Sequence, residues 1–194
     1  EASLDFKLGA RSLLVTFHPA TLEKSTSAQQ MTELLAALNT LQDTRLIFTM
    51  PNADTGSRAL IGMIEQFVTA HPNARAYTSL GQLRYLSCVR HVDGVVGNSS
   101  SGLAEVPSFG KGTINIGERQ RGRVRAESVI DCPPERAAIV AALAQLYSPA
   151  FQAKLKGVRN PYGDGGASER VVETIARVPL DGIIKKRFFD LPGL

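Results

Sequence analysis

The stretch GVVGNSSSGL, residues 94–103, decides the fold because it joins an apolar run to a serine-rich turn and then to the start of a helix. A strand, a turn and a helix in this order form the repeating unit of parallel α/β sheets. Backbone N–H groups at a helix start, together with serine hydroxyls, are suited to bind a phosphate group. A capped helix behind a flexible loop fits the same spacing, so both interpretations stay open here.

Strands and helices alternate on both sides of this stretch. Apolar runs predict strands at residues 12–17, 45–50, 74–78, 94–97, 112–116 and 128–132. Apolar residues at helical spacing predict helices at residues 21–41, 56–70, 80–90, 103–109, 133–147 and 167–177. We expect Thr21 to cap the first helix and the pair Pro133-Pro134 to open the fifth. This alternation is typical of an α/β fold, a Rossmann-like parallel sheet with helices on both faces.

Length and composition narrow the class of protein. The chain has 194 residues, of which 43% are hydrophobic and 21% are charged, as expected for one globular domain. No apolar run approaches the roughly 20 residues of a membrane span. Cys88 and Cys132 lack metal-site spacing and suit a reducing compartment, so we expect a cytoplasmic protein without metal or cofactor. The net charge of +4 comes without aromatic residues in the basic loop, which argues against nucleic acid as a partner.

Polar residues directly follow several of the expected strands. His18 follows the first strand, Asn52 the second and Ser99 the fourth. Because the carboxyl ends of parallel strands share one edge of the sheet, where ligands bind, we expect these side chains to lie close together. A histidine here can hydrogen-bond a phosphate or transfer a proton near neutral pH, although a single histidine is more often structural.

The segment GERQRGR, residues 117–123, places three arginines among glycines just after the fifth expected strand. Guanidinium groups match the geometry of phosphate oxygens, so Arg119 and Arg123 are candidates to clamp a diphosphate. A solvated basic loop is the alternative interpretation. The position of the segment, next in order after the serine-rich turn, favours the binding role.

Two acidic residues complete the set of candidate ligand contacts. Glu105 lies about one helical turn beyond the serines, where its carboxylate can accept hydrogen bonds from ribose hydroxyls. Asp54 either binds ligand beside Asn52 or caps the helix that follows. The glycine-rich segment at residues 160–166 is a tight turn by composition, or else closes over a nucleotide. The basic and aromatic tail at residues 183–194 is suited to pack on a partner domain.

Five blocks of the sequence together resemble the C-terminal half of the hydrolysing UDP-N-acetylglucosamine 2-epimerases, including the bacterial enzymes of sialic and legionaminic acid synthesis. They occur in the order of that family and extend over most of the chain. The serine turn, residues 98–102, followed by the arginine loop, residues 117–125, is a combination specific to the family. The His-Pro pair by itself is weak evidence for the resemblance. The blocks are TFHP at 16–19, PNADTGS at 51–57, GNSSSG at 97–102, NIGERQRGR at 115–123 and YGDG at 162–165.

The resemblance implies two Rossmann-like domains in a glycosyltransferase-B-like arrangement, with the active site in the cleft between them. Residues 1–194 are then expected to form a single C-terminal UDP-binding domain whose N-terminal partner domain is missing. The implied catalytic candidate of this half is His18, near the diphosphate and the reacting sugar. The implied UDP contacts are Ser99, Ser100 and Arg119 at the phosphates, Glu105 at the ribose, and Asn52 along the cleft.

The resemblance also implies a reaction. The family removes UDP by anti elimination to give a 2-acetamidoglycal, and water then adds to release the free sugar with inverted C2. The acidic catalytic residues belong mostly to the N-terminal domain. We therefore expect the UDP-binding half of an epimerase for UDP-N-acetylglucosamine or a UDP-diacetamido-trideoxyhexose, inactive alone and homo-oligomeric at full length. The alternatives are a non-hydrolysing 2-epimerase, a glycosyltransferase-B nucleotide-sugar-binding domain, and a stand-alone binding module.

Overall fold

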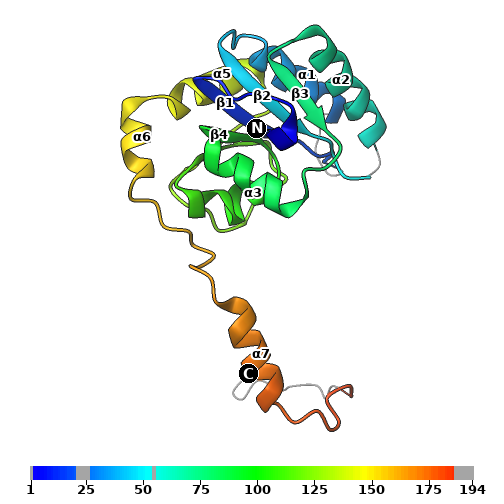
Figure 1. Ribbon diagram of the computed structural model, residues 1–194, viewed down its shortest axis with the longest axis vertical. Helices are drawn as coiled ribbons and strands as arrows, with labels where there is room; N and C mark the ends of the chain where they lie inside the picture. Colours follow the sequence, from blue (N-terminus) through cyan, green and yellow to red (C-terminus); the bar gives the residue numbers. More distant parts are fainter. Residues whose placement is uncertain (1, 21–26, 54–55, 186–194) are drawn as a thin grey trace, which may run out of the picture. The chain divides into compact units, whose positions relative to one another are not determined.

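The computed structural model describes residues 2–20, 27–53 and 56–185. The chain divides into two compact units, Glu1–Tyr162 and Gly163–Leu194. The first unit contains the sheet, and the described part of the second contains one α-helix (Figure 1). That residues 1–194 act as a single domain in the protein stays a prediction.

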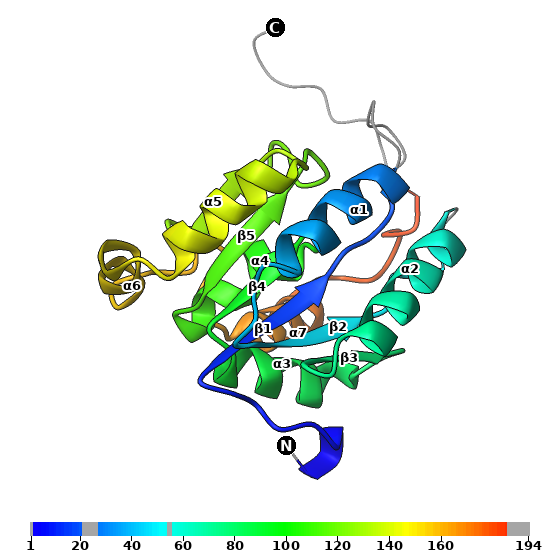
Figure 2. The same cartoon turned by 90° about the horizontal axis from the view of Figure 1, so that it is seen from above.

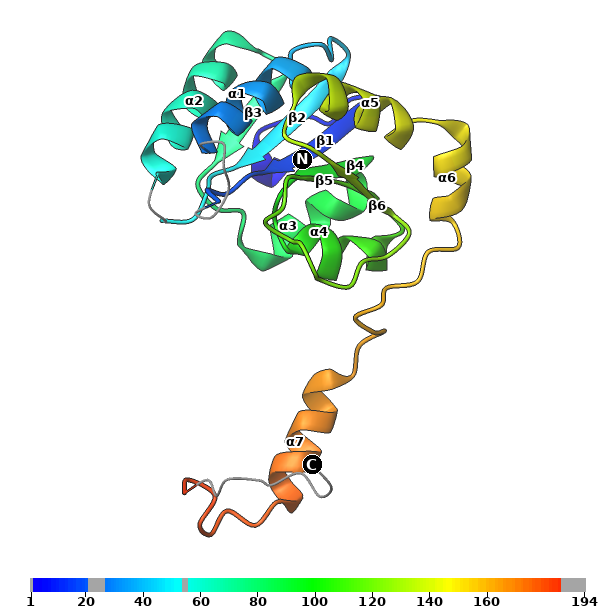
Figure 3. The same ribbon diagram turned by 180° about the vertical axis from the view of Figure 1, so that it is seen from behind.

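Among the described residues, six strands form one sheet in the order β3-β2-β1-β4-β5-β6, and every neighbouring pair is parallel. The direction of winding reverses between β1 and β4, and in parallel sheets of this kind ligands bind at the carboxyl ends of the strands. Figure 3 shows β4, β5 and β6 side by side beyond this point. The strands span Arg11–Thr16 (β1), Thr44–Thr49 (β2), Ala74–Tyr77 (β3), Gly94–Gly97 (β4), Gly112–Ile116 (β5) and Val129–Cys132 (β6).

Helices cover both faces of the sheet, so the predicted α/β fold is confirmed (Figure 2). Helices α1, α2 and α5 lie on one face, where Leu13 and Val15 point into a shared core. Leu14 points to the other face and packs in a second core with Val89 of α3 and Val106. The helices span Ser27–Leu38 (α1), Ser57–Ala70 (α2), Gly81–His91 (α3), Ser101–Ala104 (α4), Arg136–Leu146 (α5) and Pro149–Leu155 (α6), with 3-10 helices at Ala2–Leu4 (η1) and Val106–Phe109 (η2).

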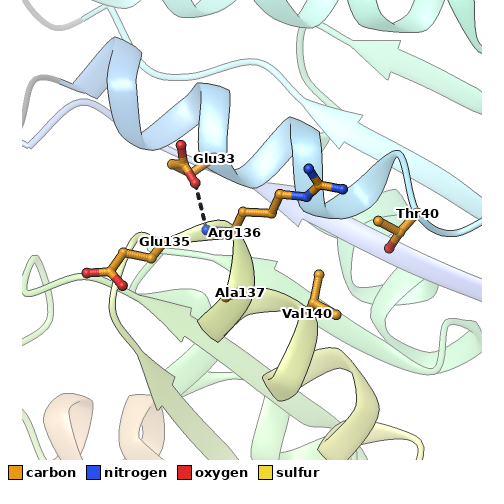
Figure 4. Close-up of a pocket in the computed structure, with 6 residues that line it drawn as sticks. All are labelled: Glu33, Thr40, Glu135, Arg136, Ala137 and Val140. Atoms are coloured by element: carbon orange, nitrogen blue, oxygen red, sulfur yellow. Dashed lines mark hydrogen bonds between the residues drawn. The ribbon is translucent and has the colours of Figure 1, made fainter.

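The expectation that Pro133-Pro134 opens the fifth helix is wrong, because α5 begins at Arg136. Glu135 is its N-cap with extended backbone (φ −125°, ψ 135°) and no capping hydrogen bond from its own side chain. The cap comes instead from α1, where a carboxylate oxygen of Glu33 accepts the backbone N–H of Arg136 at 2.8 Å (Figure 4). A carboxylate at a helix N-terminus satisfies an N–H group and complements the helix dipole.

Two further differences have local causes. The helix expected at residues 103–109 is split into α4 and η2, because Pro107 has no N–H group for the helical hydrogen bond. Helix α6 was not predicted, although Ser148 accepts the N–H of Phe151 at 3.3 Å and Pro149 occupies its first turn. The proposed capping residue Thr21 lies outside the described residues.

The second unit contains α7, Ala167–Arg177, as predicted. Its apolar side chains recur at helical spacing and are exposed, with Val171 at 54% and Ile175 at 60%. An apolar stripe of this kind is suited to pack against another element. No described helix is long and apolar enough to cross a membrane. The expected packing of the tail at residues 183–194 stays a prediction, because most of that segment lies outside the described residues.

Candidate functional site

Gly97 ends β4 and lets the polypeptide pass very close to β1. Its φ of +140° is a conformation that residues with a side chain rarely adopt. A Cβ atom at this position would lie 1.9 Å from the carbonyl oxygen of Thr16, so only glycine fits. The following N–H group, of Asn98, donates to the same oxygen at 3.2 Å. The serine-rich turn therefore starts in direct contact with the end of β1.

The buried side chain of Asn98 fastens this turn to the loop after β1. Its Oδ1 accepts the backbone N–H of His18 at 2.7 Å, and its Nδ2 donates to the carbonyl oxygen of His18 at 2.8 Å. Only 1% of Asn98 is exposed, so both hydrogen bonds are shielded from water. His18 and the serine turn thus meet at one edge of the sheet, as the parallel topology predicts.

The imidazole of His18 is held in one orientation. It is 7% exposed, and its Nδ1 accepts the backbone N–H of Asn52 at 3.2 Å. In the neutral ring the proton is then carried by Nε2. The arrangement brings His18 and Asn52 together, as expected from their positions after neighbouring strands.

The serine turn leaves two N–H groups for a ligand. The carbonyl of Ser99 accepts the N–H of Gly102 at 3.2 Å, so the turn is helical from its start. The carbonyl of Ser100 accepts the N–H groups of Leu103 and Ala104, both at 3.0 Å. Within the described residues, the N–H groups of Ser99 and Ser100 donate no hydrogen bond. The hydroxyl of Ser101 donates to the carboxylate of Glu105, one turn later, and fixes its position.

The arginine loop is docked on the serine turn through one atom, the carbonyl oxygen of Asn98. Nη1 of Arg119 donates to this oxygen at 3.1 Å, and Nε2 of Gln120 donates to it at 2.8 Å. Gln120 is only 2% exposed, so the contact forms the buried base of the loop. Arg119 therefore lies beside the serine turn, where a guanidinium complements a bound anion.

The remaining arginines of this loop make other contacts. Arg121 pairs with Glu118 at 3.3 Å on the surface, and Arg125 pairs with Asp131. Arg123 is exposed, and no hydrogen bond from its side chain to the serine turn forms in the part of the chain that the structure describes. Its role in phosphate binding stays a prediction from charge.

A cleft of about 740 Å³ lies at the carboxyl ends of β1 and β2, beside α3. His18, Asn52 and Glu105 line it together, although they come from three separate segments. Its floor includes Thr16 and Thr49, whose hydroxyls form a buried hydrogen bond of 2.7 Å. Imidazole, amide, hydroxyl and carboxylate groups are therefore available to a polar ligand in this cleft.

Not every predicted contact lines the cleft. The lining residues do not include Ser99, Ser100 or Arg119. The serine turn is connected to the cleft by the hydrogen bonds from Asn98 to His18 and from Ser101 to Glu105, and Arg119 is hydrogen-bonded to Asn98. Asp54 lies outside the described residues. The candidate site therefore has two adjoining parts, a cleft and a loop pair beside it.

Tyr85 of α3 was missed by sequence reasoning, which treated that helix only by its apolar spacing. It lines the cleft, and its buried hydroxyl has no hydrogen-bond partner of good geometry among the described residues. Burial raises the pKa of Tyr85, while the nearby hydroxyls of Ser101 and Thr16 oppose this shift. A neutral phenol with an unsatisfied donor inside a cleft is suited to hydrogen-bond a ligand.

A doubly wound parallel sheet with a cleft at the carboxyl ends of its strands places the chain among the Rossmann-like α/β proteins that bind ligands at that edge. The model of the UDP-N-acetylglucosamine 2-epimerase family matches residues 3–176, and the chain belongs to this family.

Individual relatives agree with this assignment. The polysialic acid biosynthesis protein P7 of Escherichia coli is 37% identical, over 97% of this chain and 49% of its own length. The GDP/UDP-N,N'-diacetylbacillosamine 2-epimerase (hydrolyzing) of Campylobacter jejuni is 35% identical, over 98% of this chain and 50% of its own length. The chain thus spans about half the length of the curated relatives that it matches.

A solved structure shares the fold. The S. aureus MnaA-UDP co-structure superposes with a TM-score of 0.67 at 17% identity, covering 85% of this chain and 44% of that one. The chain therefore shares the fold of a little under half of that structure.

Proposed function

We propose that this chain is the UDP-binding half of a hydrolysing 2-epimerase that acts on UDP-N-acetylglucosamine or a UDP-diacetamido-trideoxyhexose. Family membership supports the epimerase, and the name of the Campylobacter jejuni relative supports hydrolysis and a diacetamido sugar. The observation that carries the binding role is the convergence of His18, the serine turn and Arg119 on Asn98.

The proposed contacts follow from the donors available at each position. The N–H groups and hydroxyls of Ser99 and Ser100 donate to the diphosphate, and Arg119 complements its charge. Glu105, oriented by Ser101, accepts hydrogen bonds from the ribose hydroxyls. His18 presents Nε2 towards the diphosphate and the sugar attached to it.

These groups assist the departure of UDP. In the elimination, a base takes the proton from C2 of the sugar, the C1–O bond breaks, and its electron pair leaves with the β-phosphate. Hydrogen-bond donors held at the diphosphate stabilise the charge that develops there. Water then adds its hydroxyl at C1 and a proton at C2 of the glycal. The base belongs to the partner half in this proposal, and the full-length protein is a homo-oligomer.

The test is a calorimetric titration of this chain with UDP. Arg119→Ala and the double variant Ser99→Ala/Ser100→Ala should each weaken binding about tenfold or more, since hydrogen bonds to charged groups contribute strongly. Arg121→Ala is the matched control, because it removes the same charge from the same loop at a residue paired with Glu118. Equal losses of UDP affinity in Arg119→Ala and Arg121→Ala would contradict a specific contact of Arg119 with the diphosphate and would indicate general electrostatic attraction.

The reaction is tested with the full-length protein and UDP-N-acetylglucosamine or its diacetamido analogue. Release of UDP together with a free C2-inverted sugar supports the proposal. A product that retains UDP indicates a non-hydrolysing epimerase, and transfer of the sugar to an acceptor indicates a glycosyltransferase. We place the protein in the cytoplasm, which is compatible with its two buried free cysteines, Cys88 and Cys132.

A further inference from the structure

The segment at residues 160–162 reaches back to the helix that follows the serine turn. Nδ2 of Asn160 donates to the carbonyl oxygen of Ala104 and to the hydroxyl of Ser108, at 2.7 Å each. Ala104 is the last residue of α4 and directly precedes Glu105. The side-chain amide of Asn160, which follows α6 in the chain, is therefore hydrogen-bonded to both the end of α4 and the middle of η2.

Tyr162 extends the connection to the arginine loop. Its backbone N–H donates to Oδ1 of Asn160 at 3.0 Å, and its hydroxyl donates to the carbonyl oxygen of Val124 at 2.9 Å. Val124 lies in the loop between β5 and β6 and is 62% exposed. We call Asn160, Pro161 and Tyr162 the strap, because these three residues join the serine-turn helix to the arginine loop.

The strap supplies a second connection between two loops that otherwise meet at the carbonyl of Asn98. That first connection fixes the base of the arginine loop, at Arg119 and Gln120. The bond from Tyr162 holds the far side of the loop, beyond Gly122, whose φ of +80° turns the backbone. A loop restrained at both sides keeps its spacing from the serine turn, whereas a loop restrained at one side can swing.

We propose that Asn160 and Tyr162 are positioning residues for nucleotide binding, which set the spacing between the serine turn and the arginine loop that together hold the diphosphate. The inference rests on the proposed function. Tyr162 is 50% exposed, so its ring contributes little to the core, and the removal of its hydroxyl should loosen the loop without unfolding the sheet.

The experiment compares Tyr162→Phe and Asn160→Asp with wild type, using UDP by calorimetry and uridine by NMR titration. Each variant keeps the size of the side chain and removes a donor. Asn160→Asp also adds a negative charge, so Tyr162→Phe is the variant that isolates the loss of a hydrogen bond. Tyr147→Phe is the matched control, because the hydroxyl of Tyr147 donates to Asp93 at 3.3 Å, at the opposite ends of the strands. The affinity for UDP should fall about fivefold in Tyr162→Phe and more in Asn160→Asp, as expected for one or two hydrogen bonds. Uridine, which has no phosphate, should bind all three variants as it binds wild type.

The outcomes separate this inference from the proposed function. If wild type does not bind UDP, the proposed binding role of this chain fails, and the inference fails with it. If wild type binds UDP and both strap variants bind it with the affinity of wild type, only the positioning role is overturned. Equal losses for UDP and uridine, or a matching loss in Tyr147→Phe, would also overturn it, because they indicate general destabilisation.

Discussion

Replacement of Gly97 by alanine should disrupt the sheet where β1 and β4 meet. The added Cβ would lie 1.9 Å from the carbonyl oxygen of Thr16 and 2.7 Å from its carbon, both backbone atoms of a central strand. To reach a normal carbon–oxygen contact, the two backbones would have to move apart by on the order of 1 Å or more. The pairing of Thr16 with Gly97 in the sheet opposes this movement. The φ of +140° adds backbone strain of about 1–3 kcal/mol. We expect the free energy of unfolding to fall by about 4 kcal/mol or more.

Urea denaturation followed by circular dichroism measures this change, with Gly62→Ala as the control. Gly62 lies within α2, and a Cβ there would meet no atom within 4 Å. Because alanine favours a helix over glycine, Gly62→Ala should raise the free energy of unfolding by about 0.5–1 kcal/mol. A free energy of unfolding for Gly97→Ala within about 1 kcal/mol of the wild-type value would refute the close approach of the two strands.

Two further predictions concern single hydrogen bonds. Thr16→Val and Thr49→Val should each lower the free energy of unfolding by about 1–2 kcal/mol, because each leaves the other buried hydroxyl unpaired. The double variant should lose less than the sum in urea denaturation, and strict additivity would contradict the pairing. Ser148→Ala should cost about 1 kcal/mol and speed hydrogen exchange in α6, while Ser148→Asp should not. Unchanged exchange in Ser148→Ala would show that the cap does not hold α6.

The sheet could be predicted from the sequence because its strands are short apolar runs separated by helical spacing. A parallel sheet also brings together residues that follow its strands, which is why His18, Asn52 and Ser99 are expected near one another. The limits of the helices were harder to predict. The start of α5 depends on Glu33, a residue on another helix, and local pattern contains no information about that contact.

The inner part of the site could not be predicted for a related reason. Arg119 and Arg123 carry the same charge in the same loop, yet only Arg119 contacts the serine turn in the part of the chain that the structure describes. The difference depends on where the backbone turns, including the positive φ of Gly122. The role of Asn98 could not be predicted from its neighbours in the sequence, because its hydrogen-bond partners lie about 80 residues before it and about 20 residues after it.

Asn98 explains how this edge of a common fold becomes a defined site. Its N–H, its carbonyl and both polar atoms of its side chain form hydrogen bonds, which reach the end of β1, the His18 loop and the arginine loop. The serine turn and Arg119 are thus anchored to the same residue. Catalysis by charge stabilisation requires donors that are already in place when charge develops. In the proposed elimination, that requirement falls on the groups around the departing diphosphate, and one buried asparagine anchors them at the base of the two loops.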